Sequence, residues 1–173
     1  MLKSKNIYLR SVEIEDATLL MLWENNPSHW KATDTEVPFS MTGIMQLIEQ
    51  QQQIRSTGQL RFLICINETN EPVGAIDLYD ADFKNGNAAV GILIGEENQR
   101  GKGFAQESLL LMIDYARDIL SFHNLYCSIQ ADNLTSLKLF ENIGFERIGV
   151  RKDWFLYRGQ RIDEIIYQLC LKK

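Results

Sequence analysis

The chain has 173 residues, of which 45% are hydrophobic and 24% charged, and its formal net charge is −5. This composition is typical of a folded globular protein and excludes the disordered and fibrous classes, and the length fits one domain spanning 1–173. The negative net charge disfavours a nucleic-acid partner.

Nothing in the sequence indicates a membrane or an oxidising compartment. Residues 1–6 lack the apolar segment of a signal peptide, and no apolar run is long enough to span a bilayer. We therefore expect a cytoplasmic protein with no membrane partner. The cysteines, Cys65, Cys127 and Cys170, are odd in number and widely spaced, which argues against a disulfide framework and a zinc site. We expect reduced, buried thiols and no bound metal.

Hydrophobic periodicity predicts one strand, two helices and then three strands in the first half of the chain. Asp16 can cap the first helix, and Asn85-Gly86 is a strong signal for a hairpin between the last two of these strands. The strands are expected at 7–12, 61–67, 72–82 and 87–95, and the helices from Asp16 through Trp23 and from Thr42 to Ile54.

The second half begins with a long helical pattern that opens at the Gly-rich segment 100–105 and runs through Leu120. A shorter helix, 135–143, ends at Gly144, which suits the left-handed backbone of a helix stop. Seven strands and about four helices, in the order βααβββαβαββ, predict an α+β fold of stacked layers. The remaining strands are expected at 125–131, 145–157 and 162–171, the last two around the turn 158–160.

The most informative segment is Arg100-Gly101-Lys102-Gly103-Phe104-Ala105, which follows an apolar strand and opens the long helix. The first N–H groups of a helix lack partners within the helix, and the helix dipole adds positive charge, so such a turn binds anions. Its glycines let the backbone approach a diphosphate closely. The G-x-x-x-x-G-K-[ST] pattern of P-loop proteins is absent, and Gln106 stands where a Rossmann motif needs Gly or Ala.

The R-x-x-G-x-A pattern of 100–105 resembles the [RQ]-x-x-G-x-[GA] signature of the GNAT family of N-acetyltransferases, which holds the diphosphate of coenzyme A. The segment from Asn133 to Phe145 is similar to the family's second signature, N-x-x-[SA]-x-x-[LI]-[YF]-x-x-x-G-F. The start of the chain at 7–10 and the tail at 151–163 resemble the branch of ribosomal-protein and spermidine acetyltransferases. The resemblance covers essentially the whole chain and implies the GNAT fold, a three-layer α+β arrangement around a mixed, mostly antiparallel, seven-stranded sheet.

The resemblance also implies a co-substrate and a binding site. Acetyl-CoA would bind with its diphosphate on the segment 100–105. The fourth and fifth strands would splay apart, so that pantetheine adds along one edge and bonds backbone groups near Leu93, Ile94 and Gly95. A backbone N–H there could polarise the thioester carbonyl. Asn133 could cap the short helix or bond the amides of pantetheine.

Acetyl transfer to an amine needs two proton transfers, because an amine of pKa ~10 must lose a proton and the departing thiolate must gain one. The family often supplies the second proton from a tyrosine at the position of Phe140, and phenylalanine has no proton to give. Asp77 could hold a cationic amine and take its proton through water, or could be a solvated strand carboxylate. Tyr79 and Tyr126 are fallback acids. The two histidines are interpreted as surface or core residues: His29 and His123.

The sequence leaves three functions open. The first is acetylation of a small polycationic amine such as spermidine or spermine, because the acidic excess lies within residues 1–90. The second is acetylation of a protein N-terminus, and the third is a CoA-binding regulatory module without turnover. A homodimer or larger homo-oligomer is expected only because symmetric assemblies are common. The acidic residues expected to line the acceptor cleft are Asp34, Glu36, Asp77, Asp80 and Asp82.

Overall fold

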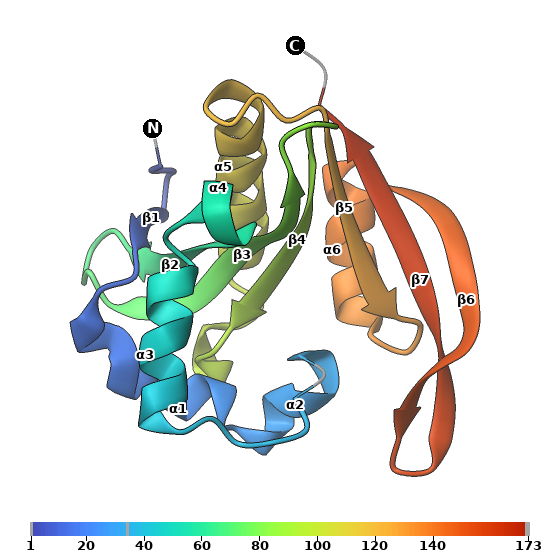
Figure 1. Cartoon of the computed structure of the whole chain (residues 1–173), viewed down its shortest axis with the longest axis horizontal. Coiled ribbons are helices and arrows are strands. Elements are labelled where there is room, and N and C mark those ends of the chain that lie inside the picture. The colour runs from blue at the N-terminus through green and yellow to red at the C-terminus, as the bar shows by residue number, and fades with distance from the viewer. Residues whose placement is uncertain (1, 34, 172–173) are drawn as a thin grey trace.

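The protein is described by a computed structural model that covers residues 2–33 and 35–171. Its strands are β1 (Ile7–Ser11), β2 (Leu60–Ile66), β3 (Pro72–Asp82), β4 (Asn87–Ile94), β5 (Asn124–Gln130), β6 (Glu146–Tyr157) and β7 (Gln160–Cys170). They form one sheet with the order β1-β2-β3-β4-β5-β7-β6 (Figure 1). Neighbouring strands pair antiparallel except β4 and β5, which are parallel. The mixed, mostly antiparallel sheet is confirmed.

The described residues form six α-helices, where the sequence predicts about four. They are α1 (Ala17–Glu24), α2 (Pro27–Thr33), α3 (Met41–Gln50), α4 (Ile54–Thr57), α5 (Phe104–Asp118) and α6 (Leu134–Ile143), with 3-10 turns η1 (Ile14–Asp16) and η2 (Glu97–Gln99). The two additional helices, α2 and α4, have seven and four residues, too few for a hydrophobic period to show. α2 begins at Pro27, whose missing N–H is tolerated in a first helical turn.

Helices cover both faces of the sheet and produce three layers. On one face, Leu20 of α1 and Ile44 of α3 pack in one cluster with Leu63 of β2. On the other face, Phe62 and Ile64 of β2 belong to a second cluster together with residues of α5 and α6. Because successive residues of a strand point to opposite faces, β2 can be apolar throughout and still bury both sides.

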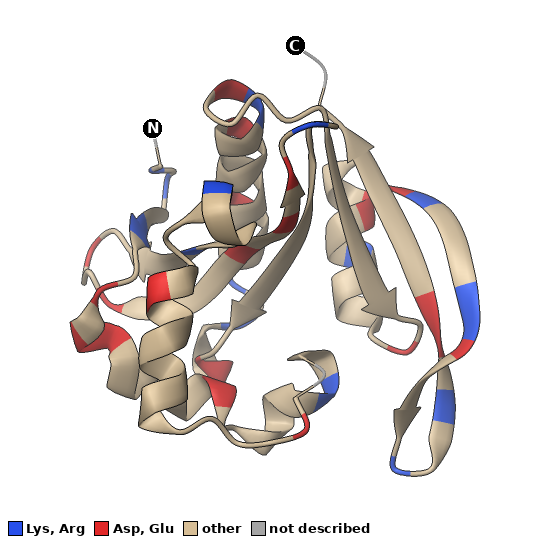
Figure 2. Ribbon diagram, viewed as in Figure 1, with Lys and Arg blue, Asp and Glu red and all other residues tan. Residues whose placement is uncertain are grey.

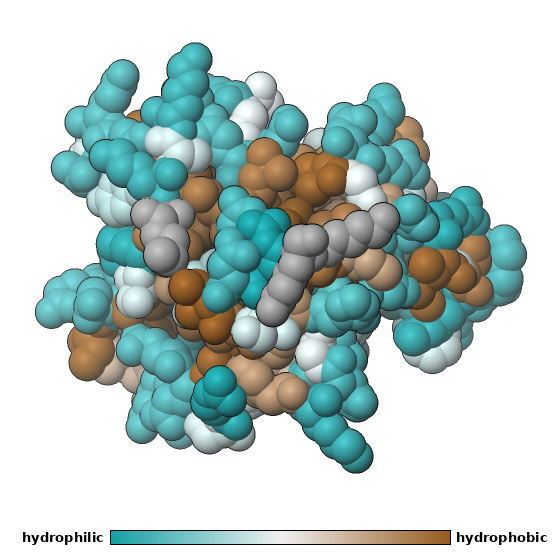
Figure 3. All heavy atoms as spheres, turned by 90° about the horizontal axis from the view of Figure 1, so that it is seen from above, coloured by the Kyte–Doolittle hydropathy of each residue, from teal (hydrophilic) through white to brown (hydrophobic). Residues whose placement is uncertain are grey.

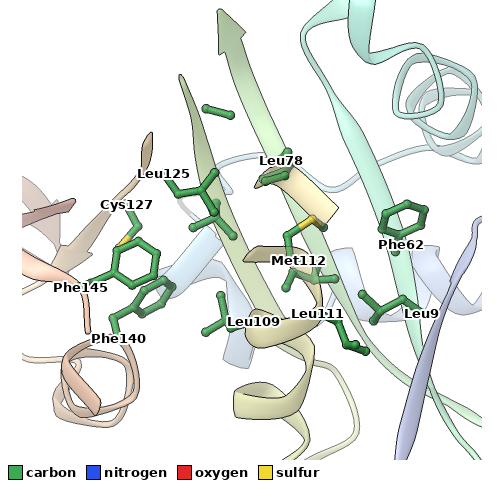
Figure 4. Packing of buried hydrophobic residues seen from close by; sticks show 14 of the residues in the cluster. Leu9, Phe62, Leu78, Leu109, Leu111, Met112, Leu125, Cys127, Phe140 and Phe145 are labelled. Carbon is green, nitrogen blue, oxygen red and sulfur yellow. The ribbon is translucent and has the colours of Figure 1, made fainter. Parts of the chain in front are cut away.

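The larger core lies between the sheet and the helices α5 and α6. Figure 4 shows Leu109 and Met112 of α5 among side chains from the central strands. Phe140 of α6 is buried there, and its ring meets Phe145 edge to face at a centroid distance of 5.0 Å. This packing holds α6 against the part of the sheet that contains β5 and β7.

The cysteines differ from the prediction in one respect. Cys65 and Cys127 are buried, but Cys170 is exposed. Strand alternation in β7 explains the difference, because it turns the neighbours Leu169 and Leu171 inward and therefore Cys170 outward. Burial raises the pKa of Cys127 to about 12, so this thiol stays protonated at neutral pH.

The parallel pairing of β4 with β5 is short. Only Asn87, Ala88 and Ala89 pair with β5, at Asn124 to Tyr126, and the two strands then diverge (Figure 1). β4 continues to Ile94 along β3. The splaying expected for the fourth and fifth strands is therefore present. Over 90–94, no strand among the described residues pairs with the β5-facing edge of β4.

On the face seen from above, hydrophilic side chains cover most of the periphery, and hydrophobic side chains show in groups nearer the middle (Figure 3). None of the helices in the described residues is long and apolar enough to cross a membrane. Figure 2 shows that Lys and Arg are frequent along the β6–β7 hairpin, whereas the acidic excess lies within residues 1–90.

Candidate active site

The turn that opens α5 has the geometry of an anion-binding loop. Gly101 and Gly103 have φ of +75° and +86°, values in the left-handed region that side-chain-bearing residues rarely adopt. Gly103 is the N-cap of α5, and no side chain caps the helix there. The first intrahelical bond runs from the Glu107 N–H to the Gly103 carbonyl at 3.1 Å. The N–H groups before it therefore lack helix partners and lie at the positive end of the dipole.

A cavity of about 450 Å³, which we call the loop groove, runs from this turn along β4 to α6. It brings together eight of the residues predicted to bind the cofactor: Leu93, Ile94, Arg100, Gly101, Gly103, Phe104, Ala105 and Asn133. Asn133 also caps α6, because its Oδ1 accepts from the Ser136 N–H at 3.2 Å. The helix ends at Gly144 with φ +105°, the left-handed stop that the sequence predicts.

Two of the predicted cofactor residues lie outside the groove. Gly95 packs against Trp23, where an added Cβ would come within 2.5 Å of the indole ring, and its N–H donates to the Val73 carbonyl at 3.0 Å. Lys102 is exposed, and its Nζ donates to Gln99 Oε1 at 2.6 Å. Position 95 therefore needs glycine for packing.

Arg100 points back toward the protein rather than only into solvent. Its Nε donates to the Ile94 carbonyl at 3.2 Å, and its terminal nitrogen lies 2.9 Å from Nε2 of His29. His29 is 2% exposed, and its Nδ1 lies 2.9 Å from the Trp23 carbonyl oxygen. The sequence predicts that His29 lies in the core or on the surface. In the structure it is buried and lines the loop groove.

A second cavity of about 400 Å³ lies beside β4, under α1 and α2. We call it the triad cavity, because three charged side chains meet there. Arg61 donates from Nε and a terminal nitrogen to both oxygens of Asp77, at 2.6 and 3.0 Å, and to Glu24 Oε1 at 2.6 Å. Burial disfavours the guanidinium charge, but the two carboxylates outweigh it and raise the pKa of Arg61. The triad carries a net charge of −1.

The wider acidic cluster expected in the acceptor cleft is not assembled. Of its members only Asp77 lines the triad cavity, and Asp34 lies outside the described residues. Glu36 is exposed and lines a different cavity near the β6–β7 turn. Asp80 is exposed at φ +49°, where the β3–β4 register shifts, and Asp82 accepts bonds from the turn at Lys84 and Asn85. The strand irregularity at Asp80 and the turn that Asp82 stabilises therefore place these two carboxylates outside the triad cavity.

A third cavity of about 370 Å³, the interstrand cavity, fills the space between the diverging strands. Phe140 lines it, and so does Tyr79, which also lines the triad cavity. The Tyr79 ring covers Gly91, where an added Cβ would lie 3.4 Å from the ring. Burial raises the pKa of Tyr79 to about 12, so its hydroxyl keeps its proton at neutral pH. Tyr126 lines none of the three cavities, and His123 is exposed.

The three cavities meet beside the middle of β4. Ile92 and Ala32 line all three of them. The Leu93 carbonyl points toward β3, because it would lie 2.3 Å from a Cβ added at Gly74. Since strand residues alternate their backbone groups between the two edges, those of Ile92 and Ile94 face the open edge. A chain-like ligand in the loop groove can therefore pair with β4 as an extra strand would.

A model of the acetyltransferase (GNAT) domain matches residues 6–146 of this chain. The chain belongs to the GNAT acetyltransferase family. It is 28% identical over 173 residues to the uncharacterized N-acetyltransferase p20 of Bacillus licheniformis. The match covers 99% of this chain and 97% of that protein. It is 24% identical to the spermidine N(1)-acetyltransferase of Escherichia coli strain K12, over 96% of this chain and 86% of that one.

The fold of this GNAT protein is shared with solved acetyltransferases. The spermidine N-acetyltransferase from Vibrio cholerae in complex with CoA and spermine superposes with a TM-score of 0.87 at 22% identity, covering 95% of each chain. A GNAT acetyltransferase from Bacillus anthracis superposes with a TM-score of 0.82 at 19% identity, covering 99% of each. As a GNAT enzyme, this protein transfers acetyl groups from acetyl-CoA to an amine.

Four polar residues of this GNAT site escape sequence reasoning. Glu24 and Arg61 complete the triad, and His29 holds Arg100. Glu164 of β7 is 4% exposed, lies 2.9 Å from an Arg151 nitrogen and lines the interstrand cavity. The available signal was a charged residue on an apolar strand face. Arg61 stands in the apolar strand Leu60–Ile66, and Glu164 has Ile162 and Ile166 two positions away on either side in β7.

Proposed function

We propose that the enzyme acetylates a primary amine of a polyamine such as spermidine or spermine, by direct attack in a ternary complex with acetyl-CoA. The observation that carries the proposal is the triad of Glu24, Arg61 and Asp77, whose net negative charge lies in a cavity beside the middle of β4. A cationic amine is stabilised next to such a charge. Relatives that acetylate spermidine support the same class of acceptor.

In this proposal acetyl-CoA occupies the loop groove. The N–H groups at the start of α5 hold its diphosphate, and the open edge of β4 at Ile92 and Ile94 pairs with pantetheine. The thioester then lies near Ile92, where the groove meets the triad cavity. A backbone N–H of this edge can stabilise the developing oxyanion.

The two proton transfers are assigned to different residues. Both oxygens of Asp77 accept from Arg61, so we assign Asp77 to anchoring the cationic amine and to taking its proton through water. Phe140 stands at the position of the usual acid and has no proton to donate. Tyr79, which lines both the triad and interstrand cavities, is the proposed donor to the departing thiolate.

The test measures thiol release from acetyl-CoA with spermidine, spermine, an aminoglycoside and short peptides as acceptors. Spermidine and spermine should be the best acceptors, and their KM should rise with added salt because charge attraction is screened. Asp77→Asn should raise the KM for spermidine about tenfold or more, with little change in the KM for acetyl-CoA, because a charged contact is lost. Asp163→Asn removes a carboxylate that also pairs with a cation, Lys152, but lies outside the three cavities, and should change neither value.

Acetylation of neutral peptide N-termini with polyamines ignored would favour the protein-acetylating alternative. Absence of thiol release with every acceptor, despite CoA binding, would favour a regulatory module. We also propose that copies of the chain associate, since a solved spermidine N-acetyltransferase of Vibrio cholerae is dodecameric. The edge strand β6 offers a surface for this, with Ile148, Trp154 and Leu156 exposed.

A further inference from the structure

The buried histidine of α2 makes a contact that the chemistry above does not use. His29 is 2% exposed, and each of its ring nitrogens lies 2.9 Å from a partner, the Trp23 carbonyl oxygen and a terminal nitrogen of Arg100. A carbonyl only accepts, so Nδ1 must carry the proton of the neutral ring. Nε2 then has a free lone pair, and the Arg100 guanidinium, which only donates, bonds to it.

This contact fixes the first residue of the diphosphate loop. Arg100 also donates to the Ile94 carbonyl at 3.2 Å and lies 3.9 Å from Glu97. The guanidinium thus joins three parts of the molecule: α2, the end of β4 and the loop before α5. The Arg100 side chain is 45% exposed, so without these contacts it would be free to adopt many rotamers, and ordering it costs conformational entropy.

Two further bonds tie the same loop to the α1–α2 segment. Trp23 Nε1 donates to Glu96 Oε1 at 2.9 Å, and the Ser28 hydroxyl donates to Glu97 Oε1 at 3.3 Å. Ser28 and Glu97 are exposed, whereas the His29 ring is buried and has both nitrogens engaged. Solvent therefore competes less with the His29 contact than with the contact between Ser28 and Glu97.

We propose that His29 is a positioning residue for cofactor binding, which orders Arg100 and with it the loop 100–105 before acetyl-CoA arrives. The proposal rests on the diphosphate role of that loop. A loop that is already ordered binds its ligand without a further loss of conformational entropy. Because α2 also lines the triad cavity through Ala32 and Thr33, one helix supports both the cofactor loop and the acceptor side.

Two substitutions test the contributions of the two ring nitrogens separately. The amide of His29→Asn reaches only as far as Nδ1, so it keeps a donor for the Trp23 carbonyl and loses the acceptor for Arg100. The longer His29→Gln places its amide oxygen near the position of Nε2 and can still accept from Arg100. His29→Asn should weaken CoA binding in calorimetry about tenfold. His29→Gln should keep an affinity close to wild type.

Kinetics should show the same separation. In His29→Asn the KM for acetyl-CoA should rise while kcat and the KM for the acceptor change little, because the histidine touches neither reacting atom. In an Arg100→Ala background, His29→Asn should have no further effect on CoA affinity, since the partner is already absent. His123→Asn, at the exposed histidine, serves as the control and should bind CoA normally.

Three results would overturn the proposal. These are wild-type affinity in a folded His29→Asn protein, equal losses in the Asn and Gln variants, and an undiminished loss in the Arg100→Ala background. The failure of the loop assignment itself is distinguishable. If Gly103→Val leaves CoA binding intact, the loop does not hold the diphosphate, whatever the histidine variants do.

Discussion

Arg61 determines which atoms the carboxylate of Asp77 contacts in the candidate active site. A strand carboxylate beside an amine site is a candidate base, but here both of its oxygens accept from a buried guanidinium. Such pairing occupies both oxygens of the carboxylate and fixes its position beside the triad cavity. In the proposed mechanism Asp77 is therefore a fixed anchor for the cationic amine, and Glu24 on the other side of Arg61 keeps the formal net charge of the group negative.

A second residue-scale question is which group protonates the thiolate. Tyr79→Phe should lower kcat by ~10²-fold or more if its hydroxyl is the donor. Burial raises the pKa of Tyr79 to about 12. If Tyr79 is the proton donor, kcat should therefore not fall near pH ~10, where an unperturbed tyrosine ionises. The measurement is kcat against pH for the wild type and the variant.

Phe140→Tyr supplies the complementary test, because it adds a hydroxyl beside the interstrand cavity with little change in volume. The double variant Tyr79→Phe with Phe140→Tyr should recover part of the lost rate. An unchanged kcat and pH profile in Tyr79→Phe would mean that thiolate departure is not limiting or that solvent supplies the proton.

At the scale of elements, the start of α5 combines a helix terminus with a glycine-rich turn. Gly101 and Gly103 have positive φ, and in the described part of the chain no atom lies within 4 Å of a Cβ added to either. The space would tolerate a side chain, so the backbone conformation is what requires glycine. A left-handed residue with a side chain costs roughly 1–2 kcal/mol, which the chain would relieve by changing the shape of the turn.

Gly103→Val should therefore abolish or strongly weaken CoA binding measured by calorimetry, while the protein still folds. Gly159 in the β6–β7 turn offers a matched control. Its φ is +80°, and an added Cβ would also have no atom of the described residues within 4 Å. Gly159→Val carries a similar strain and should leave CoA affinity unchanged. Equal losses in both variants would indicate a general loss of stability.

For the whole molecule, the divergence of β4 from β5 turns one sheet into two halves with a binding edge between them. The loop groove draws its lining from α2, β4, the start of α5 and α6. α2, α6 and the segment from β4 to the start of α5 are far apart in sequence and come together only in the folded chain. A ligand in this groove therefore joins the two halves of the molecule.

We expect CoA to protect these elements together in hydrogen exchange. Amides of 27–33, 92–106 and 133–139 should exchange more slowly with CoA, whereas the β6–β7 turn at 157–161 should not change. At a concentration of 100 times Kd, CoA should stabilise the protein by about 2.7 kcal/mol and raise the melting temperature. Protection confined to α3 or to the hairpin turn would contradict the placement of the cofactor.

The sequence alone predicts the features that depend on neighbours along the chain. The period-2 strands, the Asn85-Gly86 hairpin, the Gly144 helix stop and the glycine turn before α5 follow from local backbone preferences. The short helices α2 and α4 do not, because seven and four residues give too little periodicity. The buried position of Cys170 was also predicted wrongly, since the exposure of a strand residue depends on its phase and on the end of the sheet.

The tertiary structure decides the contacts between residues distant in sequence. Arg61 meets Glu24 and Asp77, and Arg100 meets His29, through strand register and helix packing that no local pattern encodes. The sequence therefore determined the family, the succession of strands along the chain and the glycine turn before α5, whose signals are local. Only the packed fold determined which charges share a cavity, because side-chain partners are set by the sheet positions that bring them within bonding distance.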